Sequence, residues 1–127
     1  MIAVGVDLVE VASVEASLAT HAERYLERVY TDRELCESRS PDGTPDARKL
    51  AARFAAKEAA LKAMNVGDEP IPWRSIGVRS ESCGAPTIEL RGAAAALART
   101  RGIERLALSL THEGPFAAAV VVAEADR

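Results

Sequence analysis

An alanine-rich segment, residues 46–64, constrains the fold of this chain more than any other part of its sequence. At about 100° per residue, its larger apolar side chains form one stripe roughly 80° wide. These side chains are Leu50, Phe54, Leu61 and Met64. Lys57 lies inside that stripe, while Glu58 and Lys62 lie along one edge and Arg53 along the other. The segment therefore predicts a long helix that packs on a core and carries charges where apolar side chains are expected.

Two interpretations of these charges are open. In the first, the stem of Lys57 covers the core and its amine reaches water, and Glu58 and Lys62 form a surface pair worth a few tenths of a kcal/mol. In the second, the charges line a cleft in which a bound anion and a cation satisfy them. The helix by itself does not decide between the two.

Asp7 favours the second interpretation. Residues 2–11 are apolar almost throughout and rich in β-branched side chains, which predicts a buried strand. On such a strand Asp7 shares a face with Ala3, Gly5 and Val9 and is the one ionisable group there. A buried carboxylate needs a partner, and Gly5 leaves room beside it for another backbone or a ligand. Asp7 is either a capping carboxylate at the strand end or, together with Glu58, one of the few carboxylates that a Mg²⁺ site requires.

The rest of the chain alternates short helices and strands. Ser13 is a candidate cap for a helix that contains Leu18, and a second helical stretch follows through Val29. Thr31 and Glu34 have capping-box spacing. Further strands are predicted at 76–81, 87–90, 106–111 and 116–124, a helix at 92–101, a loop at 38–46, and turns at 82–86 and 112–115. Strands in hairpin arrangement mixed with helices predict the α+β class, with one domain over residues 1–127.

Composition excludes several kinds of protein. A net charge of −3 and a pI near 5.4 argue against nucleic acid as the main partner, so any anion site has to be local. The apolar start is too short to span a membrane and lacks a basic leader with a cleavage site, so we expect a cytoplasmic protein without a membrane partner. Cys36 and Cys83 lack metal-ligand spacing and are expected to be reduced thiols without a chemical role.

Two motifs together resemble the signature of the 4′-phosphopantetheinyl transferase superfamily. GVD at 5–7 and FAAKEAALK at 54–62 match its two parts, G-[IV]-D and [FW]-x-x-K-E-[AS]-x-x-K. Segments 24–35, 84–90 and 109–122 look like the short holo-acyl-carrier-protein synthase type, in the right order. The resemblance implies an α+β fold in which an antiparallel sheet packs against the long helix.

The resemblance also implies a reaction, in which the phosphopantetheine arm of coenzyme A moves to a serine of an apo acyl carrier protein. Adenosine 3′,5′-bisphosphate would be released. Asp7 and Glu58 would hold Mg²⁺ against the diphosphate, and Lys62 would neutralise the charge that develops there. Lys57 would meet a phosphate in the cleft. The base that takes the serine proton would be either Glu58 or a metal-bound water.

Other residues are implied to contact coenzyme A. Arg48 and Arg53 resemble the basic positions around its 3′-phosphate, and Pro86 resembles a residue that lines the adenine pocket. Ser109 and His112 match a stretch that faces coenzyme A, although His112 also reads as an ordinary turn histidine at a strand end. Such proteins are typically homotrimers with sites between subunits, so the strand at 106–111 and the turn before Thr87 would serve a neighbour.

The chain departs from the family pattern at two positions. Ala3 stands where the family usually has a glycine, and Ser13 stands where relatives often carry an arginine that faces the carrier protein. Arg24 and Arg28 remain as a basic ridge, so the identity of the carrier is affected more than the chemistry. Two other functions stay open: a metal-dependent nucleotide phosphohydrolase using the same carboxylates, and a non-catalytic relative that binds carrier proteins.

Overall fold

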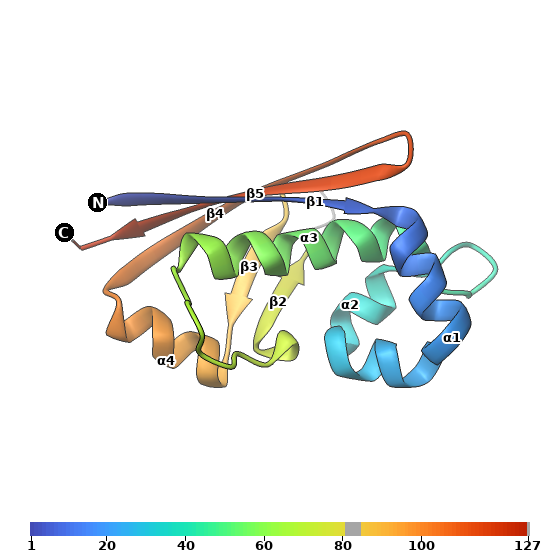
Figure 1. Cartoon of the computed structure of the whole chain (residues 1–127), viewed down its shortest axis with the longest axis horizontal. Coiled ribbons are helices and arrows are strands. Elements are labelled where there is room, and N and C mark those ends of the chain that lie inside the picture. Colours follow the sequence, from blue (N-terminus) through green and yellow to red (C-terminus); the bar gives the residue numbers. More distant parts are fainter. Residues whose placement is uncertain (81–84, 127) are drawn as a thin grey trace.

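The computed structural model describes residues 1–80 and 85–126, in which ten elements form an α+β fold (Figure 1). The elements are β1 (Ile2–Glu10), α1 (Val11–Val29), α2 (Asp32–Glu37), α3 (Ala47–Ala63), η1 (Trp73–Ser75), β2 (Ile76–Arg79), β3 (Thr87–Leu90), α4 (Gly92–Thr100), β4 (Ile103–Glu113) and β5 (Phe116–Ala125). The predicted fold class is confirmed.

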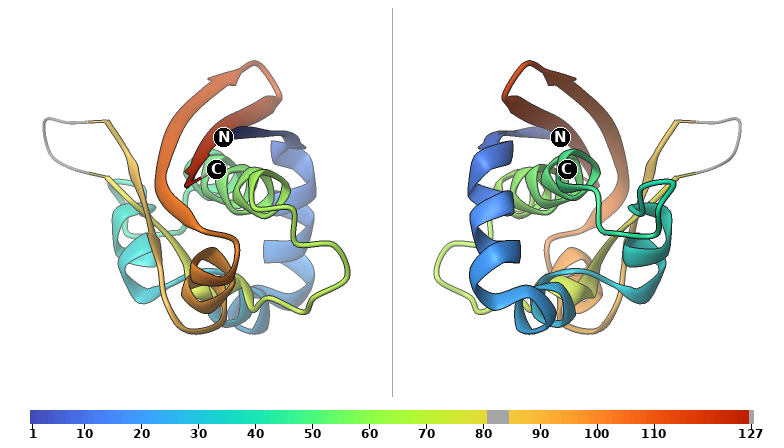
Figure 2. Two further views of the ribbon diagram at one scale, coloured as in Figure 1. Left: turned by 90° about the vertical axis from the view of Figure 1, so that its left-hand side faces the viewer. Right: turned by 90° about the vertical axis from the view of Figure 1, so that its right-hand side faces the viewer.

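Three long strands form an antiparallel sheet in the order β1-β5-β4, and α3 runs along one face of it (Figure 1). A two-stranded antiparallel ribbon, β2-β3, lies on the other side of α3. Viewed along α3, the sheet curves over this helix, and its outer face is left open (Figure 2). The long helix is therefore the centre of the core, and its two sides face different partners.

The predicted helix at 46–64 is confirmed. Asp46 caps it by accepting hydrogen bonds from the backbone N–H groups of Arg48 and Lys49, and Met64 is its C-cap. The buried alanines of α3 allow β1 to approach very closely. A Cβ atom on Gly5 would overlap the carbonyl oxygen of Ala59, so β1 and α3 lie at a separation that only glycine permits. This close approach brings Asp7 to the helix.

The prediction of a buried strand at 2–11 is only half right. The inner face of β1 carries Ala3, Gly5, Asp7 and Val9, as its alternation predicted. Its outer face carries Ile2, Val4, Val6 and Leu8, which are between 57 and 67% exposed. Within one chain, none of the ten elements described covers this side, because the helices that follow β1 pack against the other face of the sheet.

The N-terminal helices also differ from the prediction. One continuous helix, α1, replaces the two predicted stretches, and it begins at Val11 without a side-chain cap. Ser13 is therefore inside the first turn and is not the cap. The capping box of Thr31 and Glu34 at the start of α2 is confirmed. No helix in the described part of the chain has the length and apolar character that crossing a bilayer requires.

The remaining elements follow the prediction closely. The strands at 87–90, 106–111 and 116–124 are confirmed, and Gly102 ends the α4 segment with a φ of +69°. The strand predicted at 76–81 ends at Arg79, and the turn predicted at 82–86 lies partly outside the described residues, as does Cys83. Cys36 is an exposed free thiol.

Candidate functional site

Asp7 and Lys62 form an ion pair where β1 crosses α3. The Nζ atom of Lys62 donates hydrogen bonds to Asp7 Oδ1 at 3.1 Å and to the carbonyl oxygen of Val6 at 3.0 Å. The Asp7 side chain is only 15% exposed, whereas that of Lys62 is 53% exposed. The carboxylate is thus held in the structure and the ammonium group faces solvent, which is a geometry in which an outside anion can reach the lysine.

Glu58, one turn before Lys62 on the same side of α3, completes the cluster. Burial raises the pKa of the Glu58 carboxyl, the negative charge of Asp7 raises it further, and Lys62 acts in the opposite direction. The two carboxylates are therefore close enough to repel each other, as the pattern of the sequence predicted. A bound cation would relieve that repulsion.

The carboxylates of Asp7 and Glu58 suit magnesium better than a softer metal. Across residues 1–80 and 85–126 there is no group of three or more His, Cys, Asp or Glu side chains that could hold a metal. Mg²⁺ commonly binds one or two carboxylates and completes its octahedron with waters and substrate phosphates. Asp7 and Glu58 fit that requirement, since they supply two carboxylate groups beside an open pocket.

A second hollow lies nearer the N-terminal end of α3. It is a cavity of about 280 Å³ lined by Asp46, Arg48, Lys49, Ala52, Arg53, Leu110, Thr111 and His112. The structure therefore brings together Arg48, Arg53 and His112, which come from α3 and from the far end of β4. Lys49 is a further cation of the cavity that was not predicted from the sequence, although its place next to Arg48 could have indicated it.

Arg53 is the most deeply buried cation of this cavity, with 8% of its side chain exposed. It donates hydrogen bonds to the carbonyl oxygen of Lys49 and to Ser80 Oγ, and Glu37 lies 3.7 Å away. Its Nε atom is buried and has no hydrogen-bond partner within residues 1–80 and 85–126. Because guanidinium groups form strong charge-assisted hydrogen bonds with phosphate, Arg53, Arg48 and Lys49 make this cavity suitable for an anion.

The interpretation of Lys57 as a phosphate ligand is wrong in this structure. Its side chain is fully buried and forms an ion pair of 2.8 Å with Glu34, which is also fully buried. Lys57 Nζ also donates to the carbonyl oxygens of Trp73 and Ile76. The sequence identified Glu34 only as a capping residue, yet its second oxygen accepts a hydrogen bond from the N–H of Val78. Lys57 is therefore part of the core and not of the cleft.

Two residues predicted to contact coenzyme A, Ser109 and Pro86, do not line the basic cavity of their own chain. Ser109 is exposed on the outer face of the sheet, opposite Val120. Pro86, partly buried, precedes β3 and does not line the cavity that contains Arg53 and His112. Ser109 lies on the face of the sheet opposite to α3, and so points away from Glu58 and Lys62 of its own chain.

The three predicted carrier-protein contacts all lie on α1 and are exposed. Arg24 and Arg28 are one turn apart and lie on the same side of α1, whereas Ser13 lies in its first turn, before the bend that Figure 1 shows in this helix. Because α1 follows directly from β1, Ser13 is the end of this exposed row that lies nearest to Asp7 along the chain.

Comparison with known proteins identifies the family. The family model for the 4′-phosphopantetheinyl transferase superfamily matches residues 3–121. A holo-[acyl-carrier-protein] synthase from Anaeromyxobacter dehalogenans is 41% identical, with 98% of this chain and 96% of the relative covered. One from Paramagnetospirillum magneticum is 40% identical, with 99% of this chain and 98% of the relative covered.

Solved structures agree with the sequence comparison. Holo-[acyl-carrier-protein] synthase from Neisseria meningitidis has a TM-score of 0.85 at 32% identity and covers 98% of this chain and 99% of its own. The enzyme from Helicobacter pylori in complex with coenzyme A has a TM-score of 0.82 at 28% identity and covers 95% of this chain and 99% of its own. The chain therefore belongs to the 4′-phosphopantetheinyl transferase superfamily, as an enzyme of the holo-[acyl-carrier-protein] synthase type.

Proposed function

We propose that residues 1–127 act as one domain that moves the phosphopantetheine arm of coenzyme A to a serine of an acyl carrier protein. Adenosine 3′,5′-bisphosphate is the other product, and the reaction depends on Mg²⁺. The observation that carries this proposal is the cluster of Asp7 on β1 with Glu58 and Lys62 on α3, a helix that also lines a basic cavity. The coenzyme A complex of the similar Helicobacter pylori enzyme supports the choice of donor.

Each member of the cluster has a role in this reaction. Asp7 and Glu58 would hold Mg²⁺, which when bound would neutralise charge on the diphosphate. Lys62 contacts the diphosphate from the solvent side and stabilises the charge that grows as the bond to phosphorus breaks. Glu58 is also the candidate base for the serine hydroxyl, because its raised pKa brings a carboxylate closer to the working pH.

The basic cavity is the proposed site of the 3′-phosphate. Arg53 and Glu58 are five residues apart on α3, which separates them by about 7.5 Å along the helix axis and by about 140° around it. The cavity and the cluster therefore face different sides of the helix. The cations that line the cavity, Arg53 and the exposed Arg48 and Lys49, are the groups that would receive this phosphate.

One experiment tests the proposal as a whole. The protein is incubated with coenzyme A, Mg²⁺ and an apo acyl carrier protein, and the carrier is weighed by mass spectrometry. A carrier that gains one phosphopantetheine supports the proposal. Phosphate release that needs no carrier would instead support a nucleotide phosphohydrolase, and a carrier that binds without gaining mass would indicate a non-catalytic relative.

The 3′-phosphate site predicts a change in selectivity. Arg53→Ala is expected to weaken coenzyme A binding about tenfold or more, while turnover at saturation stays close to normal, because the reaction does not alter the 3′-phosphate. Calorimetry with coenzyme A and dephospho-coenzyme A checks this. The wild type should bind dephospho-coenzyme A more weakly, and Arg53→Ala should distinguish the two ligands much less, because only Arg48 and Lys49 remain. Equal affinity of the wild type for both ligands would rule out the pocket.

The exposed row on α1 is the proposed carrier surface. Because Ser13 supplies no charge, the encounter with an acidic carrier rests mainly on Arg24 and Arg28. Ser13→Arg is expected to raise kcat/KM severalfold at low salt and to leave saturated turnover nearly unchanged, whereas Arg24→Glu lowers kcat/KM. Rates measured against salt concentration check both variants. If neither responds at low salt, the carrier docks elsewhere.

We also propose that the protein assembles as a homotrimer with active sites between subunits. The exposed outer face of the sheet supports this, because Val4, Val6 and Leu8 of β1 lie opposite Val122, Val120 and Ala118 of β5 and form one apolar surface. Ser109 points out of the same face, where it would meet a neighbour.

Val6→Asp is expected to break this assembly, because it places a charge in the middle of the apolar face. Native mass spectrometry should give three times the chain mass of 13.5 kDa for the wild type and the mass of a single chain for the variant. Ala96→Asp, on the exposed side of α4, is the matched control and should leave the assembly intact. A wild type that runs as a monomer would contradict the trimer directly.

A further inference from the structure

The loop between α3 and η1 forms a wall of the pocket that contains Glu58 and Lys62. This pocket of about 450 Å³ is lined by Glu58, Leu61, Lys62, Asn65, Val66, Gly67, Glu69 and Ile71. Five of these eight residues belong to the loop. The position of the loop therefore sets the width of the pocket beside the catalytic cluster.

The loop has little hydrogen bonding of its own. Asn65 and Gly67 have positive φ angles of 54° and 67°. Among the described residues, the backbone–backbone hydrogen bonds of the loop are all short-range, and the last of them runs from the N–H of Glu69 to the carbonyl oxygen of Val66 at 3.5 Å. In residues 1–80 and 85–126, the side-chain hydrogen bonds to residues 65–71 all come from one residue, Arg101.

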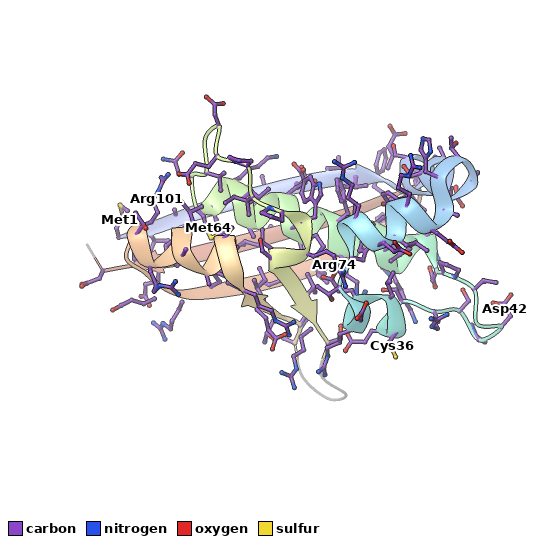
Figure 3. The ribbon with its side chains drawn as sticks, turned by 90° about the horizontal axis from the view of Figure 1, so that it is seen from below. Met1, Cys36, Asp42, Met64, Arg74 and Arg101 are labelled. Carbon is purple, nitrogen blue, oxygen red and sulfur yellow. The ribbon has the colours of Figure 1, made fainter. Side chains whose placement is uncertain are left out.

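Arg101, at the end of α4, donates hydrogen bonds to two residues of the loop. Its Nη1 atom donates to the carbonyl oxygen of Asn65 at 2.8 Å, and its Nη2 atom donates to Glu69 Oε1 at 3.3 Å. Figure 3 shows Arg101 at the end of α4, beside the C-terminal end of α3 that Met64 marks. One planar guanidinium thus fixes both the start and the middle of the loop.

The contact between Arg101 and Glu69 also affects the charge of the pocket. Glu69 and Lys62 line the same pocket, and the Glu69 side chain is 56% exposed. Without Arg101, the negative charge of Glu69 would stand unpaired next to the place where the anionic diphosphate is proposed to bind. Arg101 therefore both holds the loop and removes a charge that would repel the substrate.

We propose that Arg101 is a positioning residue for coenzyme A: by holding Asn65 and Glu69, it keeps the loop at 65–71 open to the part of coenzyme A that extends beyond the diphosphate. The inference rests on the proposed function. The pocket begins at Glu58 and Lys62, where the diphosphate is proposed to bind, and continues along the loop, so the loop is placed to contact the pantetheine arm.

The test compares Arg101→Ala with Arg99→Ala, an exposed arginine in the last turn of the same helix. Arg101→Ala should raise the Kd and the KM for coenzyme A about tenfold and leave the KM for the carrier protein unchanged. Arg99→Ala should behave as the wild type. The emission of Trp73, the one tryptophan of the chain, measures the Kd without any catalysis.

A second substitution separates the two effects of Arg101. Adding Glu69→Gln to Arg101→Ala should recover part of the lost affinity, because the repelling charge is gone, and the recovery should shrink as salt is raised. An unchanged Kd for coenzyme A in Arg101→Ala, or a rise confined to the carrier KM, would overturn the inference. A wild type that transfers nothing would instead overturn the proposed function.

Discussion

Transfer of phosphopantetheine is expected to fall by about a hundredfold or more when Asp7 is replaced by asparagine. The amide has nearly the same shape as the carboxylate, so the close packing of β1 on α3 is kept. What is lost is a negative charge that the structure holds beside Glu58 and Lys62. The proposed metal site then keeps a single carboxylate, and the charge that develops on the diphosphate is stabilised less.

The measurement is the initial rate of carrier modification at saturating coenzyme A, followed over a range of Mg²⁺ concentrations. Excess Mg²⁺ should restore little of the rate, because the missing group is a ligand and also the partner of Lys62. Asp126→Asn makes the same chemical change at an exposed carboxylate and should have no effect. Near-normal transfer by Asp7→Asn, with a melting temperature equal to that of the wild type, would remove Asp7 from the site.

The second large effect is on stability and comes from the buried pair of Lys57 and Glu34. Lys57→Ala is expected to lower the free energy of unfolding by about 3–5 kcal/mol, because it leaves the Glu34 carboxylate charged, buried and without its cation. It also removes the hydrogen bonds that tie α3 to the carbonyl oxygens of Trp73 and Ile76. Urea unfolding followed by circular dichroism measures the change.

Two further variants show whether the cause is the buried charge. Lys57→Met with Glu34→Gln removes both charges and should be clearly more stable than Lys57→Ala, since no ion is left uncompensated. Lys62→Ala removes an exposed lysine one turn and a half away and should lower turnover with little change in unfolding free energy. A Lys57→Ala protein as stable as the wild type would mean that Glu34 finds another partner or a proton.

Local signals in the sequence were sufficient for most elements. The helix at 46–64 was predictable because its apolar stripe has helical period, and Asp46 supplies a cap at its start. Asp7 was predictable as a special residue because strand alternation puts it on the inner face. These signals depend on neighbours within a few residues, so they need no knowledge of the rest of the chain.

The role of Lys57 was not predictable in this way. Helical period placed it correctly within the apolar stripe, but its partner Glu34 is separated from it by a loop and a change of direction. A buried lysine and a lysine in a ligand cleft have the same local pattern. Only the packing of α2 under α3 determines which of the two occurs.

The exposure of the outer face of β1 was also not predictable from the local sequence. Its unbroken apolar run is equally compatible with burial by the chain's own helices and with burial by another copy, since both remove the side chains from water. The sequence by itself determined most of the elements, the inner position of Asp7 and the side of α3 on which Glu58 and Lys62 lie. Tertiary structure alone decided that Lys57 belongs to the core, that Arg101 holds the loop beside Lys62, and that one side of the sheet stays uncovered, because each depends on contacts between segments that are distant along the chain.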